Sequence, residues 1–247
     1  MKLSILIPAY NEEGSIAETL LHISHVLKRE NIEHEILVVN DNSKDNTLLE
    51  LEILKQAIDT LRIVTNTGPN GFGNAVRFGL EKFEGDCVAI MMADLSDDPE
   101  DLVRFYRTMV NKKVDCVFGS RWIHGGQVFG YPKPKRFLNR VFNTIVRIMF
   151  RIKYNDITNA FKLYKKETIA GLMPLLSPHF NLTLELPLKA IVRGFSYSIL
   201  PNSWRNRKHG ESKLKIKEMG SRYFFILLYC LIEKYFSRGD FKKDISP

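Results

Sequence analysis

The chain has 247 residues, of which 45% are hydrophobic and 26% are charged, as in a soluble globular protein that can bury a sizeable core. Its longest apolar run, residues 223–232, is about half the ~20 residues that a spanning helix needs, which excludes a single transmembrane helix. The net charge of +8 and the pI near 9.3 suggest an anionic partner. Composition alone does not choose among nucleic acid, a phosphorylated metabolite and an anionic membrane face.

The N-terminal half alternates strand-like and helix-like segments. Short runs rich in Leu, Ile and Val predict strands at residues 3–8, 34–40, 61–66, 86–93 and 114–120. Between them, apolar residues at helical spacing predict helices at residues 15–30, 45–58, 73–83 and 99–112. Apolar strands that alternate with helices favour a mostly parallel sheet covered by helices on both faces.

Four of these strands end in polar segments, at residues 8–13, 40–46, 92–98 and 119–122. Ligands of parallel sheets bind beyond the carboxyl ends of the strands. We therefore expect these four segments to meet at one edge of the sheet and to form the functional site.

The second half is more basic. Residues 131–153 combine a broad apolar face with seven Lys or Arg residues and no acid. A strand-like segment at 158–167, a helix-like segment at 182–194 and a strand at 196–204 follow, and residues 213–243 are again basic and amphipathic. The sequence shows no internal repeat and no linker.

Three cysteines, Cys87, Cys116 and Cys230, are far apart and form no C-x-x-C pair. We interpret them as core residues of a reduced compartment. The apolar stretch near the N-terminus is short and ends in a proline turn, which does not match a signal peptide. These features predict a cytoplasmic protein.

The acids after the fourth strand have two interpretations. Asp97 and Asp98 precede Pro99 and are expected to cap the helix at residues 99–112. Asp94 lies upstream of that cap and is not explained by it. Together with the Ser96 hydroxyl and phosphate oxygens, its carboxylate would suit Mg²⁺ or Mn²⁺. Asp41, after the second strand, fits either a turn or a contact to a nucleotide.

The segment NGFGNAVRFGL, residues 70–80, is a glycine turn that enters a helix. It is neither a P-loop nor a Rossmann fingerprint. Close packing at the helix start is at least as good an explanation for its glycines as contact with phosphate.

Seven segments occur in a characteristic order, namely IPAYNE, VVNDNSKDNT, NGFGNAVRFGL, MADLSDD, GSR, DITNAFKLYKK and RKHGESK. Together they resemble the family 2 glycosyltransferases of the GT-A fold, specifically the polyprenyl-phosphate hexose transferases typified by dolichol-phosphate mannose synthase. The resemblance runs from residue 3 to about residue 214. It implies an α/β GT-A domain over residues 1–212, followed by a basic amphipathic helical segment over residues 213–247.

The resemblance implies a role for individual residues. Asp94 matches the metal-binding second acid of the family's D-x-D motif, and Arg121 matches an arginine that lines the reaction site. The positions that would hold the nucleotide-sugar donor are Pro8, Tyr10, Glu12, Val39, Asp41, Ala93, Arg207 and Lys213. Arg207 and Lys213 belong to a loop that would close over the pyrophosphate.

One departure concerns the metal. The first acid of the D-x-D motif is Met92 here, and the glutamine usually found two residues after the second acid is Ser96. A thioether is a poor ligand for a hard cation. Binding of Mg²⁺ or Mn²⁺ would then depend on Asp94, the diphosphate, water and Ser96, and we expect it to be weak or altered in preference.

The implied reaction moves a hexose, with inversion, from GDP-mannose or a UDP-hexose to a dolichyl or undecaprenyl phosphate. A phosphate acceptor is already an anion at neutral pH and needs no general base. It needs a cationic grip instead, for which Arg121 is the first candidate, with Arg136 and Arg140 next.

Two alternatives stay open at this point. Transfer to a sugar hydroxyl would need a general base, for which the chain offers Glu185 or Asp156. The substitution at Met92 also admits a non-catalytic homologue. The basic amphipathic stretches predict peripheral contact with the inner face of a membrane, or packing on the domain or on a second copy in a homodimer. Nucleic-acid binding is not expected, because no such motif is present.

Overall fold

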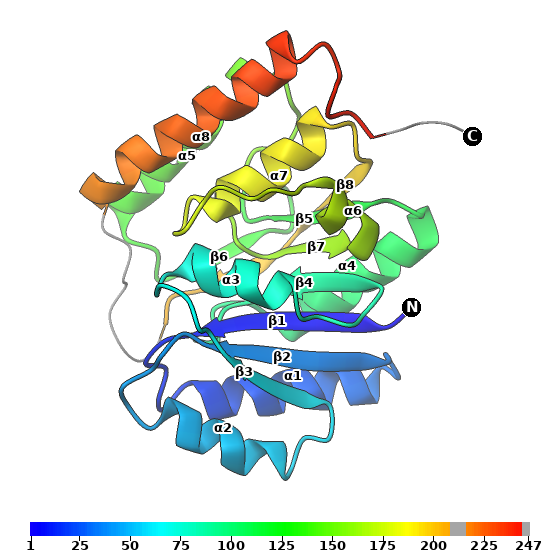
Figure 1. Ribbon diagram of the computed structural model, residues 1–247, viewed down its shortest axis with the longest axis vertical. Coiled ribbons are helices and arrows are strands. Elements are labelled where there is room, and N and C mark those ends of the chain that lie inside the picture. Colours follow the sequence, from blue (N-terminus) through cyan, green and yellow to red (C-terminus); the bar gives the residue numbers. More distant parts are fainter. Residues whose placement is uncertain (208–215, 244–247) are drawn as a thin grey trace.

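The computed structural model describes residues 1–207 and 216–243, and its centre is a seven-stranded sheet (Figure 1). The strand order is β3-β2-β1-β4-β7-β5-β8. The strands are β1 (Leu3–Ala9), β2 (His34–Asn40), β3 (Leu61–Thr65), β4 (Cys87–Ile90), β5 (Cys116–Ser120), β7 (Lys162–Lys165) and β8 (Tyr197–Pro201). A second, two-stranded sheet pairs β6 (Gln127–Phe129) with β9 (Ser203–Arg205).

The sheet is parallel except at β7. This strand pairs antiparallel with both β4 and β5, so that Lys162 lies opposite Ile90 on one side and Phe118 on the other. The predicted mostly parallel sheet is confirmed, but the reversed strand is not evident from the sequence. Its reversal places the segment before it, residues 156–161, at the edge where the parallel strands end.

Helices cover both faces of the sheet, as predicted. They are α1 (Ile16–Arg29), α2 (Thr47–Lys55), α3 (Phe72–Leu80), α4 (Pro99–Lys112), α5 (Lys133–Phe150), α6 (Lys166–Gly171), α7 (Leu182–Val192) and α8 (Ile216–Phe236). Successive strand residues point to opposite faces. In β1, Leu6 joins the core with α3, α7 and α8, whereas Ile5 and Ile7 join the core with α1 and α4.

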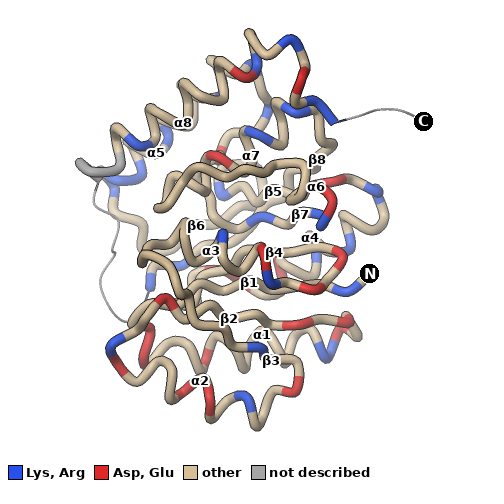
Figure 2. Tube along the Cα trace, viewed as in Figure 1, with Lys and Arg blue, Asp and Glu red and all other residues tan. Residues whose placement is uncertain are grey.

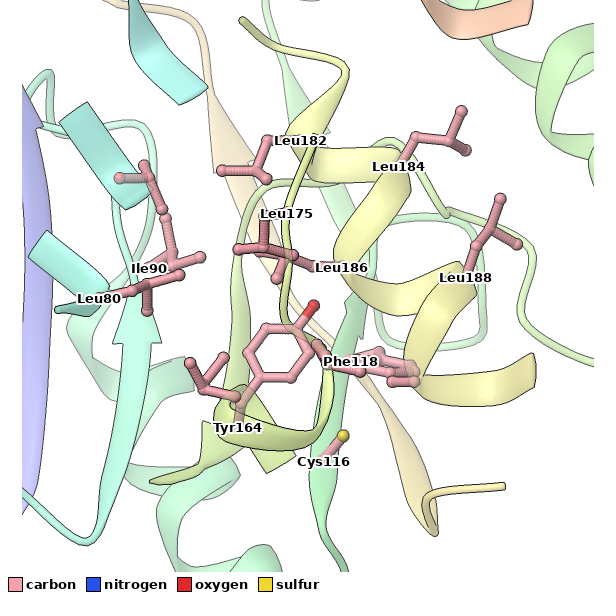
Figure 3. Close-up of a cluster of buried hydrophobic side chains, with 14 of the residues drawn as sticks. Leu80, Ile90, Cys116, Phe118, Tyr164, Leu175, Leu182, Leu184, Leu186 and Leu188 are labelled. Atoms are coloured by element: carbon pink, nitrogen blue, oxygen red, sulfur yellow. The ribbon is translucent and has the colours of Figure 1, made fainter. Parts of the chain in front are cut away.

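Part of the first core lies between β4, β5, β7 and α7 (Figure 3). Tyr164 and Phe118 extend from the sheet toward leucines of α7, and their rings are 5.9 Å apart. α7 is buried over almost its whole length, which explains why its sequence is mostly apolar and lacks a polar face.

The last helix, α8, packs against the core on one face of the sheet. Ile226, Leu227 and Cys230 of α8 are buried in the first core, and α8 lies beside α5, where Phe142 and Tyr223 meet edge to face (Figure 1). The tail then returns to the sheet, where Lys243 forms an ion pair with Asp115 at 3.0 Å. The predicted boundary at residues 212 and 213 lies outside the described residues.

All three cysteines are buried and free, as expected for core residues. Within residues 1–207 and 216–243, no helix is both long enough and apolar enough to cross a membrane.

Candidate active site

The polar ends of β1, β2, β4 and β5 lie at one edge of the sheet, as predicted. β1 is parallel to β2 and to β4, and β7 is antiparallel to both β4 and β5, so these four strands run in the same direction. The expected functional segments are therefore neighbours in space. Residues 156–161 and the residues after β9 join them at this edge.

Asp94 lies just after β4 in a tight, buried turn. One carboxylate oxygen, Oδ1, accepts a hydrogen bond from the backbone N–H of Ser96 at 3.2 Å. The other, Oδ2, is 2.8 Å from Nη2 of Arg207. Leu95, which lies between Asp94 and Ser96 in the chain, adopts a left-handed backbone with φ of 60°, a conformation that is uncommon outside glycine. Such strain often accompanies functional turns.

Arg207 connects the ends of two strands. Besides Asp94, its guanidinium faces Glu12, with Nη1 3.8 Å from Oε1. Two predicted donor-site residues, Glu12 and Arg207, are thus adjacent to Asp94, the predicted metal ligand. Lys213, the other predicted residue of this loop, lies outside the described residues.

Asp98 and Asp97 have different roles, and the prediction that both cap a helix is wrong for Asp97. Asp98 is the N-cap of α4 and accepts a hydrogen bond from Glu100 N at 3.0 Å. Asp97 instead turns inward and accepts from the backbone N–H of Met92 at 3.1 Å. Burial raises the pKa of Asp97 to about 7, and the charge of Asp94 acts in the same direction. Asp97 therefore braces the turn that carries Asp94.

Of the two predicted roles of Asp41, a turn residue or a nucleotide contact, its hydrogen bonds support the turn. Its carboxylate accepts hydrogen bonds from Gly71 N and Asn66 Nδ2, both at 2.7 Å. It thereby ties the end of β2 to the turn before α3. Of the other predicted donor-site residues, Pro8 and Tyr10 lie at the end of β1 and are half-buried, and the Ala93 carbonyl accepts from Thr19. The Val39 side chain lies in the core instead.

The glycines of the segment at residues 70–80 serve close packing. A Cβ on Gly73 would lie 2.4 Å from the carbonyl oxygen of Ser177, and one on Gly71 would lie 2.7 Å from that of Pro178. Beside them, Phe72 and Phe180 stack with ring centroids 4.4 Å apart. The start of α3 is therefore held against the segment before α7.

Arg121 is buried and held by Asp156. Its Nε and Nη2 each donate to the Asp156 carboxylate at 2.8 Å, and its backbone N–H donates to the same group at 2.9 Å. Burial lowers the pKa of Arg121, but the charge and hydrogen bonds of Asp156 outweigh this and raise it above its ordinary value. Arg121 is a fixed cation whose charge is largely balanced.

The other two predicted acceptor-site arginines lie on the first turns of α5 and share one aromatic partner. Arg136 and Arg140 place their guanidinium carbons 5.2 Å and 5.3 Å from the ring centre of Trp122, and that of Arg121 is 5.5 Å away. Tyr131 contacts Trp122 edge to face at 6.3 Å. The structure thus brings Arg121, Arg136 and Arg140 together around Trp122.

The family model of glycosyl transferase family 2 matches residues 4–172 of the chain. The chain belongs to this family. The glycosyltransferase is 30% identical over 224 residues to a dolichol-phosphate mannosyltransferase of Pyrococcus furiosus, covering 88% of this chain and 60% of that relative. It is 29% identical over 216 residues to the polyprenol monophosphomannose synthase of Mycolicibacterium smegmatis, covering 85% of this chain and 80% of the relative.

A third relative is the undecaprenyl-phosphate mannosyltransferase of Micrococcus luteus, with 27% identity over 220 residues that cover 87% of this chain and 88% of the relative. Among solved structures, the glycosyltransferase resembles glucosyl-3-phosphoglycerate synthase from Mycobacterium tuberculosis in complex with Mn²⁺, UDP and phosphoglyceric acid. The TM-score is 0.70 at 16% identity, covering 93% of this chain and 78% of that one. This likeness confirms the predicted GT-A architecture.

The glycosyltransferase offers few ligands of its own to a divalent cation. Among the described residues, no group of three or more His, Cys, Asp or Glu side chains could hold a metal ion. Asp94 supplies a carboxylate, and the buried Ser96 hydroxyl beside it has no hydrogen-bond partner. Two hard oxygen donors fit Mg²⁺ or Mn²⁺ when substrate phosphate and water complete the shell.

The two acids that the sequence offers as general bases, Asp156 and Glu185, both form buried ion pairs in the structure. Asp156 holds Arg121, and Glu185 on α7 is fully buried, with its carboxylate 2.7 Å from Lys189 Nζ and bonded to the N–H groups of Leu176 and Ser177. Trp122 and Lys162 were not predicted as site residues. The segments GSRW and DITNAFKLYKK contain them, but only the fold shows their partners.

Proposed function

We propose that the glycosyltransferase moves a hexose, with inversion, from a nucleotide-diphosphate sugar to a polyprenyl phosphate. The observation that carries this proposal is the contrast between the bases and the cations of the site. Asp156 and Glu185 are both locked in buried ion pairs, whereas Arg136 and Arg140 gather around Trp122 beside the Arg121–Asp156 pair. A sugar hydroxyl needs a base, but a phosphate monoester needs cations.

The relatives support the same acceptor. Their names specify dolichol-phosphate, polyprenol and undecaprenyl-phosphate substrates and mannosyl transfer. We infer mannose as the transferred sugar and GDP-mannose as the first donor to test, with a UDP-hexose as the alternative. Because the chain spans only 60% of the Pyrococcus relative, its whole activity is not carried over from that protein.

Basic and acidic side chains have different roles in this proposal. Arg136 and Arg140 would attract the acceptor phosphate, and Arg121, oriented by Asp156, would fix its position without a protonation step. Glu12 and Arg207 would hold the donor at the end of β1 and after β9. A divalent cation held by Asp94 and Ser96 would stabilise charge on the departing diphosphate.

The test is transfer of labelled mannose from GDP-mannose to undecaprenyl phosphate or dolichyl phosphate with Mn²⁺, measured as label in the lipid extract. The variant Arg136→Gln/Arg140→Gln should raise KM for the lipid phosphate roughly tenfold or more, because two charge-assisted contacts are lost. Arg147→Gln removes a charge from the last turn of the same helix and serves as the control. Label in water-soluble glycans only, or a double variant that matches the control, would contradict the proposal.

We also propose that α5 and α8 bring the site to a membrane surface, on the cytoplasmic face. α5 carries no acid, and Figure 2 shows its basic residues in blue. Apolar side chains at helical spacing are exposed on both helices, namely Phe137, Leu138, Val141, Ile145 and Ile148 of α5, and Phe224, Phe225, Leu228, Ile232, Tyr235 and Phe236 of α8. An exposed apolar stripe with cationic neighbours is typical of interfacial helices.

Co-sedimentation with vesicles of phosphatidylcholine and phosphatidylglycerol checks this surface. The wild type should bind at low salt, and Ile148→Asp should weaken binding several-fold, because Ile148 is 68% exposed and its loss costs no core packing. Light scattering of the same variant tests the homodimer alternative. No vesicle binding at any salt concentration, with a dimer that Ile148→Asp dissociates, would replace the membrane by a second copy.

A further inference from the structure

The guanidinium of Arg207 occupies the space between two acidic strand ends. It lies 2.8 Å from Asp94 Oδ2 and 3.8 Å from Glu12 Oε1, after β4 and β1 respectively. All three side chains are largely shielded, with 16% of Arg207, 6% of Asp94 and 12% of Glu12 exposed. Opposite charges at this distance attract more strongly out of water than in it.

Among the described side chains, this cluster keeps a net charge of −1 without a metal ion. Glu12 and Asp94 contribute two negative charges and Arg207 one positive charge, while Met92 adds no charge where a second acid would stand. With two carboxylates at the D-x-D positions, a single arginine would leave more negative charge uncompensated. Met92 in place of an acid and Arg207 beside Asp94 therefore both reduce the negative charge of the cluster.

Both carboxylate oxygens of Asp94 already have a partner. Oδ1 accepts from Ser96 N, and Oδ2 binds Arg207. A metal ion at Asp94 would place two positive charges beside the guanidinium. The ion and Arg207 then compete for the negative charge of one carboxylate, and their repulsion opposes joint occupancy.

We propose that Arg207 is an internal counter-cation that a divalent metal must displace from Asp94. In the metal-free protein, Arg207 pairs with Asp94 and Glu12. When the metal binds, Arg207 leaves Asp94, and the binding of each cation weakens that of the other by the same factor. That the displaced guanidinium then meets the donor diphosphate rests on the function proposed above, whereas the exchange itself does not.

The exchange is tested with Mn²⁺ alone, without nucleotide or lipid, by titrating the protein and measuring free Mn²⁺ by electron paramagnetic resonance. Arg207→Gln should bind Mn²⁺ at least fivefold more tightly than the wild type, within the range of typical coupling of about 5- to 150-fold. Arg207→Lys, which keeps the charge, should resemble the wild type.

Arg205→Gln is the matched control, because it removes the same charge two residues away, where Arg205 is exposed and lies over the Phe129 ring at 4.9 Å. It should leave Mn²⁺ affinity close to that of the wild type. Adding Asp94→Asn to Arg207→Gln should abolish the gain. An unchanged or weaker affinity of Arg207→Gln, an equal gain in Arg205→Gln, or a gain that survives Asp94→Asn would each overturn the proposal.

Thermal unfolding of each variant shows whether it is folded, and Arg207→Lys against the wild type still tests the role of charge if the glutamine variant unfolds. Under the proposal the lysine variant binds Mn²⁺ no more than about twofold more tightly than the wild type, and a larger gain would contradict it. The titration contains no sugar donor or acceptor. A failure of lipid glycosylation therefore leaves its result intact, and a failure of exchange leaves the lipid assay intact.

Discussion

Single residues of this site are defined by their partners more than by their type. Asp94, Asp97 and Asp98 follow one another within five positions, yet the first binds Arg207, the second binds Met92 N, and the third caps α4. The sequence distinguished Asp94 from a cap but grouped Asp97 with Asp98. The difference arises because Leu95 adopts a left-handed conformation and changes the direction of the chain. The residue types in this segment do not indicate that conformation.

Lys162 has a buried ammonium group whose lowered pKa should make the stability of the fold depend on pH. It is fully buried, and its ammonium donates to the carbonyls of Ile157, Asn159 and Thr183. Burial lowers its pKa to about 7, and the charge of Arg121 acts in the same direction. In the unfolded chain the lysine keeps an ordinary pKa near 10.5.

Between these two values the unfolded state binds the proton that the native state has lost, so the free energy of unfolding should rise with pH from about 7 toward 10 and be insensitive to this group below 7. The rise is at most about 1.4 kcal/mol per pH unit. Urea unfolding at pH 7, 8 and 9 should show this slope in the wild type relative to Lys162→Met. Parallel curves for the two proteins would mean that the native lysine keeps its proton.

At the scale of elements, most helices and strands follow from local pattern. Pro99 at the first position and Asp98 before it define the start of α4, and the helix ends at Lys112 as predicted. β7 is the exception. Its direction depends on how it pairs with β4 and β5, far away in the sequence, and a short apolar run carries no information on direction.

The cap of α4 provides an element-scale prediction. Asp98→Ala removes the acceptor of the Glu100 N–H and should lower the free energy of unfolding by about 1 kcal/mol. Asp98→Asn keeps a capping oxygen and should cost much less. The midpoint of urea unfolding checks both variants, and an alanine variant as stable as the asparagine variant would show that the cap contributes little.

At the scale of the whole molecule, the site depends on contacts that close the edge of the sheet. The start of α3 and the segment before α7 are about a hundred residues apart, yet Gly73 touches the backbone of Ser177 and His179. Asp41 joins the same assembly through Gly71 N. These contacts hold the end of β2 and the start of α3 against the segment before α7.

Gly73→Ala should therefore destabilise the fold, because the added methyl group meets backbone atoms that cannot move aside easily. We expect a loss of about 1–3 kcal/mol. Gly220→Ala is the matched control, since a Cβ on Gly220 of α8 meets nothing within 4 Å and alanine favours a helix. Thermal unfolding compares the two, and equal stability of Gly73→Ala and the wild type would refute the packing role.

From the sequence alone we could predict the family, the alternation of strands and helices, the edge of the sheet at which the polar segments meet, and Asp94, Arg121 and Arg207 as candidate site residues. These predictions depend on local periodicity and on motif order, both of which can be read directly from the sequence. The folded structure was needed to show that Asp156 neutralises Arg121, that Glu185 is a core residue, that Arg136 and Arg140 share Trp122, and that Arg207 pairs with Asp94. Each of these depends on the burial and distance of residues remote in sequence, and the charge of a side chain does not reveal which partner the fold brings to it.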